Sequence, residues 1–303
     1  MRLLLLVNSS ASSVTPRGRV LIQKALADGH DVTVAETNRR GHASRLALAA
    51  ARSGIEVVVV LGGDGTLNEA ANGLVGTDVA LAALPGGSTN VFARAIGLPN
   101  DPIAAVEPVL DALAKDSVRS VGLGSANGRY FLFHAGVGFD AAAVRQVERR
   151  AELKRWAGHP LFLWAAVDTW VRHYDHRRPR FSVRADDGPT IPDGYFTVCL
   201  NTNPYTFLGN RAVSVAPETT LDTGLGLATF RSLGLWTLVR SGLAALTRGT
   251  LRGQRNVAFA TEVDYVRIEG RGPVPYQVDG DYLGEVDLLE LRHEPDAIRL
   301  VLP

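Results

Sequence analysis

Cysteine is almost absent from this chain, and lysine is rare. The single cysteine, Cys199, excludes an intramolecular disulfide in the 303 residues and suits a reducing compartment. Its neighbours, Tyr195 to Leu200, are mostly apolar, so we interpret Cys199 as a core residue of a strand rather than a nucleophile or metal ligand. The only lysines are Lys24, Lys115 and Lys154, and none follows a glycine-rich turn, which excludes a Walker phosphate loop.

An excess of charge of one sign is also missing. Lysine and arginine total 32 against 31 for aspartate and glutamate, so the net charge is +1. Nucleic-acid binding by the whole chain would require a basic surface, so we expect no nucleic-acid partner and only local affinity for anions. The 46% hydrophobic content supplies enough apolar material for a packed core and excludes wholesale disorder.

The sequence has no long hydrophobic run either. Met1 to Val7 is too short for the hydrophobic region of a signal peptide, and we predict a buried first strand there. Leu161 to Val167 falls far below the roughly 20 residues of a bilayer crossing. We therefore expect a cytoplasmic protein.

The first hundred residues alternate between strand and helix patterns. The predicted strands cover residues 3–7, 31–37, 55–61 and 79–84, and the predicted helices cover 16–27, 43–52, 66–74, 89–96 and 102–114. Thr15 and Asp101 are the expected N-caps of the first and last of these helices. Residues 55–61 include four consecutive valines, as is typical of a parallel strand covered on both faces. The alternation predicts an open α/β sheet.

Beyond Arg119 the pattern changes to short apolar or alternating runs, which predicts a mostly antiparallel β domain. Within it we expect strands at 130–135, 195–200, 225–230 and 263–268, and helices over 141–173 and 235–246. Whether a last strand at 297–302 returns to the first domain is left open. The predicted domains are 1–121, completed by about 290–303, and 122–289.

Glycines cluster directly after the valine-rich strand, at Gly62, Gly63 and Gly65, with Asp64 and Thr66 among them. At the carboxyl end of a parallel strand, a helix N-terminus offers free N–H groups and a partial positive charge to a phosphate. Glycine lets the backbone approach such a ligand. A turn capped by Asp64 or Thr66 is the alternative, but a cap needs fewer glycines.

A second glycine turn, Pro85 to Asn90, follows the next predicted strand. We expect the two turns to lie side by side and to contact one polyphosphate. Gly87, Ser88 and Thr89 are candidate contacts, although a helix cap alone would explain one of the hydroxyls. Arg94 is interpreted as a phosphate clamp, with a solvated side chain as the alternative.

The run from Gly62 to Gly73, together with Pro85 to Arg94, resembles the catalytic domain of the diacylglycerol kinase family. That family includes sphingosine and ceramide kinases and soluble bacterial lipid kinases. The resemblance extends along nearly the whole chain, with weaker matches at Asn8, at Ala216 to Leu225 and at Gln277 to Asp281.

The resemblance implies an α/β domain like that of NAD kinases joined to a β-sandwich, and transfer of phosphate from ATP to a lipid hydroxyl with Mg²⁺. Diacylglycerol is the preferred acceptor because the closest resemblance is to soluble bacterial members. Asp281 and Asp64 are the candidate catalytic residues, with Asp281 as general base, and Asp222 is the candidate ligand of a structural magnesium. The candidate cofactor contacts are Asn8, Gly62, Gly63, Asp64, Gly65, Thr66, Glu69, Gly87, Ser88, Thr89, Arg94 and Asp279.

Two departures from the family's pattern bear on these roles. Thr223 stands where the family has a second aspartate, which lowers the charge of the metal segment. Asp281 is one methylene shorter than the family's usual glutamate, and a misplacement of about 1 Å can cost on the order of 100-fold in rate. Asp279 is the alternative base, and a plain hairpin turn is the structural alternative.

Residues 156–181 combine three tryptophans with a basic cluster. Aromatic anchors beside basic residues suit contact with anionic headgroups, so we expect peripheral association with the membrane that holds the lipid substrate. A core helix followed by a solvated basic loop is an equal alternative. His173 and His176 are not interpreted as metal ligands, because the flanking arginines repel cations.

Two other functions stay open. NAD kinase shares the loop from Gly62 to Thr66, although Pro85 to Arg94 resembles lipid kinases instead. A catalytically inactive regulator that binds nucleotide or lipid is suggested by Thr223 and Asp281. The acyl chains, the exact acceptor and the oligomeric state do not follow from the sequence, and a homodimer stays open.

Overall fold

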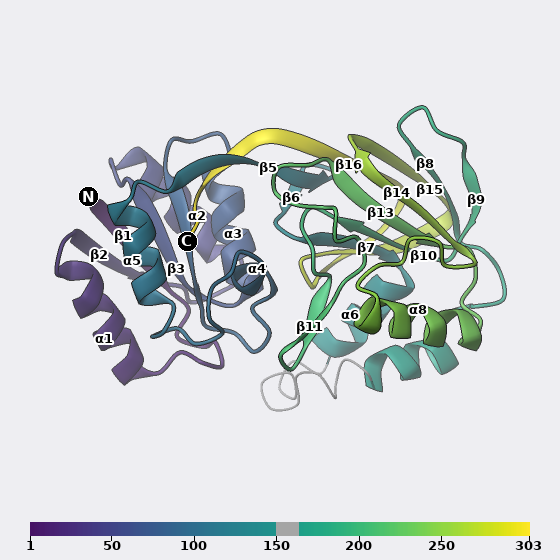
Figure 1. The fold of residues 1–303 in the computed structure, drawn as a ribbon, viewed down its shortest axis with the longest axis horizontal. Helices are drawn as coiled ribbons and strands as arrows, with labels where there is room; N and C mark the ends of the chain where they lie inside the picture. The colour runs from purple at the N-terminus through teal and green to yellow at the C-terminus, as the bar shows by residue number, and fades with distance from the viewer. Residues whose placement is uncertain (150–163) are drawn as a thin grey trace. The chain divides into compact units, whose positions relative to one another are not determined.

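Figure 1 shows the computed structural model, which describes residues 1–149 and 164–303. The chain divides into two compact units. Unit 1 comprises Met1–Val121 and Pro295–Pro303, and unit 2 comprises Gly122–Glu294. The predicted helix over 141–173 and the tryptophan-rich segment 156–181 fall partly on 150–163, outside the described residues.

Unit 1 is built on a parallel sheet in the order β4-β3-β1-β2. Its strands are β1 (Arg2–Val7), β2 (Asp31–Glu36), β3 (Val57–Gly62) and β4 (Ala80–Pro85). Strands β3 and β4 are buried along their whole length, as parallel strands covered on both faces must be. The end of β16 (Asp281–Val301) pairs with β4, placing Arg299 opposite Ala80, so the last strand does return to this unit.

The helices of unit 1 are α1 (Pro16–Ala27), α2 (His42–Arg52), α3 (Asp64–Leu74), α4 (Val91–Ala95) and α5 (Val106–Ala114). Thr15 caps α1 as predicted, since its Oγ1 accepts from the N–H of Gly18 at 3.0 Å. Helix α3 begins two residues before the prediction because Gly63 serves as its extended N-cap. Helix α5 begins later than predicted, because Asp101 closes a separate turn by accepting from the N–H groups of Ile103 and Ala104.

Unit 2 is rich in antiparallel strands, which confirms the strand-rich region predicted beyond Arg119. Its main path runs β14-β13-β10-β7-β15-β16, β8 and β9 extend from β15, β5 and β6 extend from β16, and β11 and β12 form a separate hairpin. The strands are β5 (Val118–Ala126), β6 (Arg129–Phe131), β7 (His134–Gly138), β8 (Phe181–Ala185), β9 (Ile191–Gly194), β10 (Phe196–Leu200), β11 (Thr206–Leu208), β12 (Arg211–Val213), β13 (Leu225–Phe230), β14 (Val257–Val263) and β15 (Tyr265–Val278).

Cys199 lies in the core of unit 2, packed with Phe131, Phe181 and Leu291. It is fully buried, and burial raises the pKa of its thiol, which disfavours the nucleophilic thiolate. Cys199 is therefore a core residue, as the sequence predicted.

The helical elements of unit 2 are α6 (Phe139–Glu148), the short π-helix η1 (Thr169–His173) and α8 (Leu235–Thr247). The predicted strand at 130–135 is wrong as a single element. It divides into β6 and β7 because the N–H groups of Leu132 and Phe133 donate to Asp279 instead of a neighbouring strand. The predicted strand at 263–268 spans the junction of β14 and β15. No helix in the described residues is long and apolar enough to cross a bilayer.

Candidate active site

Three loops meet at the carboxyl ends of β1, β3 and β4 in unit 1. Gly62 and Pro85 are partners in the sheet, and the N–H of Gly86 donates to the carbonyl of Gly62 at 2.7 Å. The loop after β1 joins them, since the N–H of Ser13 donates to the carbonyl of Gly86 at 2.9 Å. The two glycine turns therefore lie side by side, as the strand order predicted.

The glycines are required where the two turns approach each other. A Cβ on Gly87 would lie 2.9 Å from the Cα of Gly63, and one on Gly86 would lie 2.9 Å from the nitrogen of Gly62. Side chains at these positions would push the two backbones apart. Close packing of the two turns is thus enough to explain these glycines without a ligand. The same packing brings the backbone N–H groups of both turns close together.

Asp64 links the two turns. Its Oδ2 accepts from the N–H of Val91 at 3.0 Å, and its Oδ1 accepts from the N–H of Phe92 at 3.1 Å. These donors belong to the first turn of α4, where a carboxylate also complements the helix dipole. The alternative of Asp64 as the cap of the helix that follows it is wrong, because Asp64 is already the first residue of α3 and caps α4 instead.

Asn8 and Thr66 come together although they lie far apart in the sequence. The Nδ2 of Asn8 donates to the Oγ1 of Thr66 at 2.8 Å. Ser88 is exposed and Thr89 is half-exposed in the second turn, and Gly65 lies in the first turn of α3. The polar groups predicted around the nucleotide, apart from Glu69 and Asp279, therefore gather at one edge of the sheet.

Asn90, which together with Ser88 and Thr89 could cap α4, stands at its N-cap position but uses its side chain to close the second turn. It adopts the left-handed conformation with φ 51°, which an asparagine tolerates better than most residues. Its side chain accepts from the N–H of Gly87 and donates to the carbonyl of the same residue, both at 2.8 Å. Asn90 therefore closes the second turn, and an asparagine at the end of a glycine-rich turn was the available signal.

Positive potential at these turns has two sources. The first-turn N–H groups of α3 lie at the end of β3, where the helix dipole favours an anion. The guanidinium of Arg94 lies beside the second turn, with its Nη1 donating to the carbonyl of Thr89 at 3.5 Å. Burial lowers the pKa of Arg94, and the nearby charge of Asp64 opposes that shift. A cation thus stands where the phosphate clamp is predicted.

Glu69 is directed to another helix. Its Oε1 accepts from the N–H of Gly41 at 2.7 Å and its Oε2 accepts from the N–H of Ala43 at 3.2 Å. Both donors lie at the N-terminus of α2, so the carboxylate caps that helix. This contact accounts for Glu69 without a nucleotide.

In unit 2, Asp279 is enclosed by backbone N–H groups. Its Oδ2 accepts from the N–H of Leu132 at 2.7 Å, and its Oδ1 accepts from the N–H groups of Phe133 and His134, both at 3.0 Å. The residue is only 4% exposed. Asp279 therefore anchors the junction of β6 and β7 within unit 2, which accounts for its burial.

Asp281 lies two residues after Asp279, on the other side of a hairpin turn. Asp279 and Gly280 have φ values of 48° and 82° and form the turn of a hairpin in which Val278 pairs with Asp281. The turn that was the structural alternative is thus present. Asp281 itself lies half-buried at the first position of β16, on a rigid strand end.

A buried polar cluster contacts the turn of this hairpin, and no motif in the sequence indicated it. The Nε2 of Gln277 lies 2.7 Å from Asp140 Oδ2 and 2.7 Å from His134 Nε2. The Oε1 of Gln277 accepts from the N–H of Gly280 at 2.8 Å, and the hydroxyl of Tyr205 donates to Asp140. The members come from three segments far apart in the sequence, at residues 134–140, 205 and 277–280, so no single local motif could have shown the cluster.

Burial disfavours the charged form of both titratable groups, His134 and Asp140. Burial lowers the pKa of His134 to about 3, so its imidazole is neutral at pH 7. Burial raises the pKa of Asp140, while the hydrogen bonds from Tyr205 and Gln277 act in the opposite sense. The N–H of Gly280 needs an oxygen acceptor, which fixes the orientation of the Gln277 amide and makes its Nε2 the donor to both partners.

Asp222 lies in a tight turn with Thr220 and Thr223. Its N–H donates to the Oγ1 of Thr220, and the hydroxyl of Thr223 closes the same turn by donating to the carbonyl of Thr220 at 3.1 Å. Across residues 1–149 and 164–303, no group of three or more His, Cys, Asp or Glu side chains is placed to hold a metal ion. The role of Asp222 as a ligand of a structural magnesium therefore stays a prediction from the resemblance.

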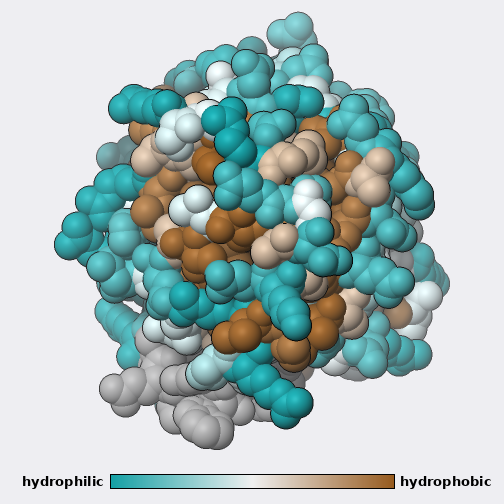
Figure 2. Space-filling view, turned by 90° about the vertical axis from the view of Figure 1, so that its left-hand side faces the viewer, coloured by the Kyte–Doolittle hydropathy of each residue, from teal (hydrophilic) through white to brown (hydrophobic). Residues whose placement is uncertain are grey.

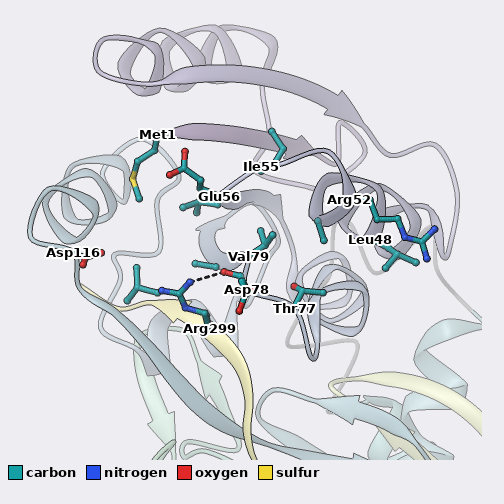
Figure 3. Close-up of a pocket in the computed structure, with 14 residues that line it drawn as sticks. Met1, Leu48, Arg52, Ile55, Glu56, Thr77, Asp78, Val79, Asp116 and Arg299 are labelled. Carbon is teal, nitrogen blue, oxygen red and sulfur yellow. Dashed lines mark hydrogen bonds between the residues drawn. The ribbon is translucent and has the colours of Figure 1, made fainter.

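A cavity of about 680 Å³ lies in unit 1 at the amino ends of the parallel strands. Met1, Glu56 and Arg299 are among the residues that line it. Figure 3 shows Arg299 on its wall, donating to the carbonyl of Asp78 at 2.7 Å. The glycine turns follow the opposite ends of the same strands, so this cavity is separate from the candidate site.

Comparison with known proteins supports the resemblance found in the sequence. Residues 2–126 match the diacylglycerol kinase catalytic domain, a span that includes all three loops. A diacylglycerol kinase from Bacillus subtilis (strain 168) is 36% identical over 268 residues, which cover 87% of this chain and 84% of the relative. This chain belongs to the diacylglycerol kinase catalytic domain family. Within the family it is also similar to a probable lipid kinase YegS-like from Pseudomonas aeruginosa (strain UCBPP-PA14), at 34% identity over 99% of this chain and 94% of the relative.

Solved structures extend the likeness to the whole fold. A putative diacylglycerol kinase from Bacillus anthracis str. Sterne superposes with a TM-score of 0.80 at 21% identity, covering 100% of this chain and 95% of that chain. The predicted combination of an α/β region with a strand-rich region is therefore confirmed, as is the predicted family.

Proposed function

We propose that this family member transfers the γ-phosphate of ATP to the hydroxyl of diacylglycerol and so forms phosphatidic acid at the surface of a membrane. The single observation that carries the proposal is the pairing of the two glycine turns at the carboxyl edge of a parallel sheet, with Asp64 tying them together. Family membership supports lipid phosphorylation as the reaction class.

The nucleotide half of the proposal rests on unit 1. Phosphoryl transfer depends mainly on positioning and on neutralising phosphate charge. We assign the ATP phosphates to the N–H groups of the two turns and to the hydroxyls of Thr66, Ser88 and Thr89, and a Mg²⁺ bound to those phosphates would neutralise part of their charge. Arg94 supplies the positive charge. Asp64 acts as a positioning residue, because its carboxylate is already bound to two N–H groups.

The acceptor half rests on the choice between Asp279 and Asp281. Each carboxylate oxygen of Asp279 accepts from at least one buried backbone N–H group, so both oxygens already have a structural partner. Asp281 lies half-buried two residues later, just after the turn. We therefore assign Asp281 as the general base that takes the proton from the lipid hydroxyl.

A labelled-ATP assay tests this assignment. The full chain is incubated with γ-labelled ATP and, in separate reactions, diacylglycerol, sphingosine, ceramide or NAD. Label is expected in phosphatidic acid, and Asp281→Ala should lower the rate by about 10²- to 10⁴-fold while nucleotide binding is kept. Asp287→Ala, which removes an exposed acid from the same strand, is the matched control and should retain wild-type turnover.

The other products each point to a different function. Label in NADP would replace the proposal with an NAD kinase, and label only in a sphingoid product would replace the acceptor. Nucleotide binding without any transfer would identify a regulator. Wild-type turnover by Asp281→Ala would remove the assigned base.

A further inference from the structure

Helix α8 in unit 2 turns large apolar side chains toward solvent, where an ordinary surface helix carries polar ones. Leu235, Trp236, Val239 and Leu243 are 60%, 78%, 50% and 61% exposed. The buried residues of the same helix are Ser241, Ala244 and Ala245. A surface helix normally turns its large apolar residues to the core, so the outer face of α8 is built to meet something other than water.

Spacing places these side chains on one stripe. Leu235, Val239 and Leu243 are four residues apart and form one row along the helix, and Trp236 lies beside that row. In Figure 1, α8 lies at the surface of unit 2. By comparison, Figure 2 shows a face on which apolar areas are broken up by hydrophilic side chains.

A second exposed apolar row lies on the segment that packs beside α8. Trp164, Val167 and Val171 are 41%, 56% and 60% exposed. Trp170 in the same segment donates from its indole nitrogen to the carbonyl of Leu233, just before α8, at 2.9 Å. The two rows therefore belong to neighbouring elements, and the second contains part of the tryptophan-rich segment predicted to contact membranes.

The stretch of sequence that contains α8 carries charge of one sign. Residues 223–261 contain no aspartate or glutamate but include five arginines, Arg231, Arg240, Arg248, Arg252 and Arg255. Arg231 and Arg252 are paired with Asp193 and Glu218. Arg240 and Arg248 are exposed and form no ion pair within the described part of the chain. Arg240 follows Trp236 by one helical turn, so a cation borders the apolar stripe.

An exposed apolar stripe bordered by arginine favours one binding partner for the outer face of α8, an anionic lipid bilayer. An anionic bilayer surface takes tryptophan and aliphatic side chains at the headgroup boundary and attracts arginine. A second copy of the chain fits less well, because a two-fold interface would bring each patch against itself and so place Arg240 near its own counterpart without an acid between them.

We propose that the outer face of α8, formed by Leu235, Trp236, Val239, Leu243 and Arg240, is the surface by which the protein docks on anionic lipid bilayers. The proposal deepens the proposed function, on which it rests, by assigning the part of the molecule that meets the membrane holding the acceptor.

Vesicle sedimentation of the full chain without ATP tests the docking surface. The vesicles are phosphatidylcholine alone or phosphatidylcholine with phosphatidylglycerol, and the variants are the double change Trp236→Ser with Leu243→Ser, and Arg240→Glu. The double variant should partition about 100-fold more weakly, at roughly tenfold per side chain. Arg240→Glu should weaken binding about tenfold on the anionic vesicles only.

Val20→Ser is the matched control, since Val20 is 63% exposed on helix α1 of unit 1, and its binding should stay within about twofold of wild type. All variants should keep the wild-type melting temperature, because the changed side chains lie on the solvent side. Unchanged vesicle binding by the double variant would overturn the proposal. A wild-type dimer that the double variant converts to a monomer in sedimentation velocity would overturn it in favour of a second copy.

Kinase activity on diacylglycerol in detergent micelles separates this proposal from the proposed function. Activity in micelles with unchanged vesicle binding of the variants would overturn the docking surface alone. Weakened vesicle binding without any phosphorylation in micelles would uphold the docking surface and overturn the lipid kinase.

Discussion

Asp64 in unit 1 and Asp279 in unit 2 both bind backbone N–H groups through their carboxylates, but the two residues differ in burial. Each carboxylate accepts from consecutive backbone N–H groups far away in the sequence, two for Asp64 and three for Asp279. Asp64 is half-exposed, whereas Asp279 is 4% exposed. The first joins two turns at a solvent-accessible edge, and the second closes a strand junction inside the β-rich unit.

The difference in burial decides what else each region can do. Around Asp64, solvent reaches the carboxylate itself, and a ligand can compete for neighbouring N–H groups. Around Asp279, every lost bond leaves a buried polar group without a partner, which costs more than the bond itself gains. The partly exposed region is therefore suited to binding, and the buried one is suited to holding Asp281 in place.

The strongest test of this comparison is the replacement of each aspartate by alanine. Asp279→Ala leaves three buried N–H groups without acceptors, so the free energy of unfolding should fall by at least about 3 kcal/mol. Asp64→Ala should cost only about 1 kcal/mol, the typical value of a helix cap. Urea denaturation of the two variants measures both effects.

An Asp279→Ala variant with wild-type stability and no phosphoryl transfer would contradict the structural role. It would return Asp279 to the candidates for general base.

The close approach of the two glycine turns gives the next largest effect. A Cβ on Gly87 would meet the Cα of Gly63 at 2.9 Å and the Oδ1 of Asn90 at 3.0 Å. Gly87→Ala should destabilise the protein by about 2 to 3 kcal/mol and weaken ATP binding, because the turns must separate. Gly29→Ala is the control, since nothing lies within 4 Å of its added Cβ. Equal melting temperatures and nucleotide affinities for the two variants would show that the turns tolerate separation.

Elements governed by local patterns were predictable from the sequence. The valine run gave a fully buried parallel strand, and the Thr15–Pro16 pair gave the start of α1 within the observed bounds. The side-by-side glycine turns followed from strand order alone. These features depend on residues close together in the chain or on the regular geometry of a parallel sheet.

Long-range capping was not predictable. Asp64, Glu69 and Asp279 each accept from N–H groups on another element, at separations of 26 to 147 residues. A carboxylate in a glycine-rich motif looks the same in sequence whether it meets a ligand or a helix terminus. The cluster around Gln277 is another case, because its members share only a place in the folded unit.

The pH dependence of stability should also distinguish the two regions, since a buried histidine occurs beside Asp279 but not at the glycine turns. Burial lowers the pKa of His134 to about 3, against about 6.5 in an unfolded chain. Between these values the unfolded state binds the extra proton, so stability is lost as the pH falls. Acidification from pH 7 to pH 5 should therefore cost about 2 kcal/mol through His134.

Asp140 acts in the opposite sense, because its raised pKa makes the folded state bind the extra proton and lowers stability as the pH rises above about 4. The quantity to measure is thus the difference in unfolding free energy between wild type and His134→Gln at each pH. That difference should move by about 2 kcal/mol in favour of the variant between pH 7 and pH 5. Parallel curves for the two proteins would show that His134 can be protonated in the folded state.

The smallest effect concerns Glu69, which extends the comparison to a third carboxylate. Glu69→Ala removes the cap of α2 and should lower the free energy of unfolding by about 1 kcal/mol. The KM for ATP should stay unchanged, because both oxygens of Glu69 are bound to Gly41 and Ala43 rather than directed to the glycine turns. Glu107→Ala, at an exposed glutamate in the first turn of α5, is the control for loss of a helix-terminal charge. A several-fold rise in the KM for ATP at unchanged stability would instead return Glu69 to the nucleotide site, and capping of a neighbouring helix would then be only part of its role.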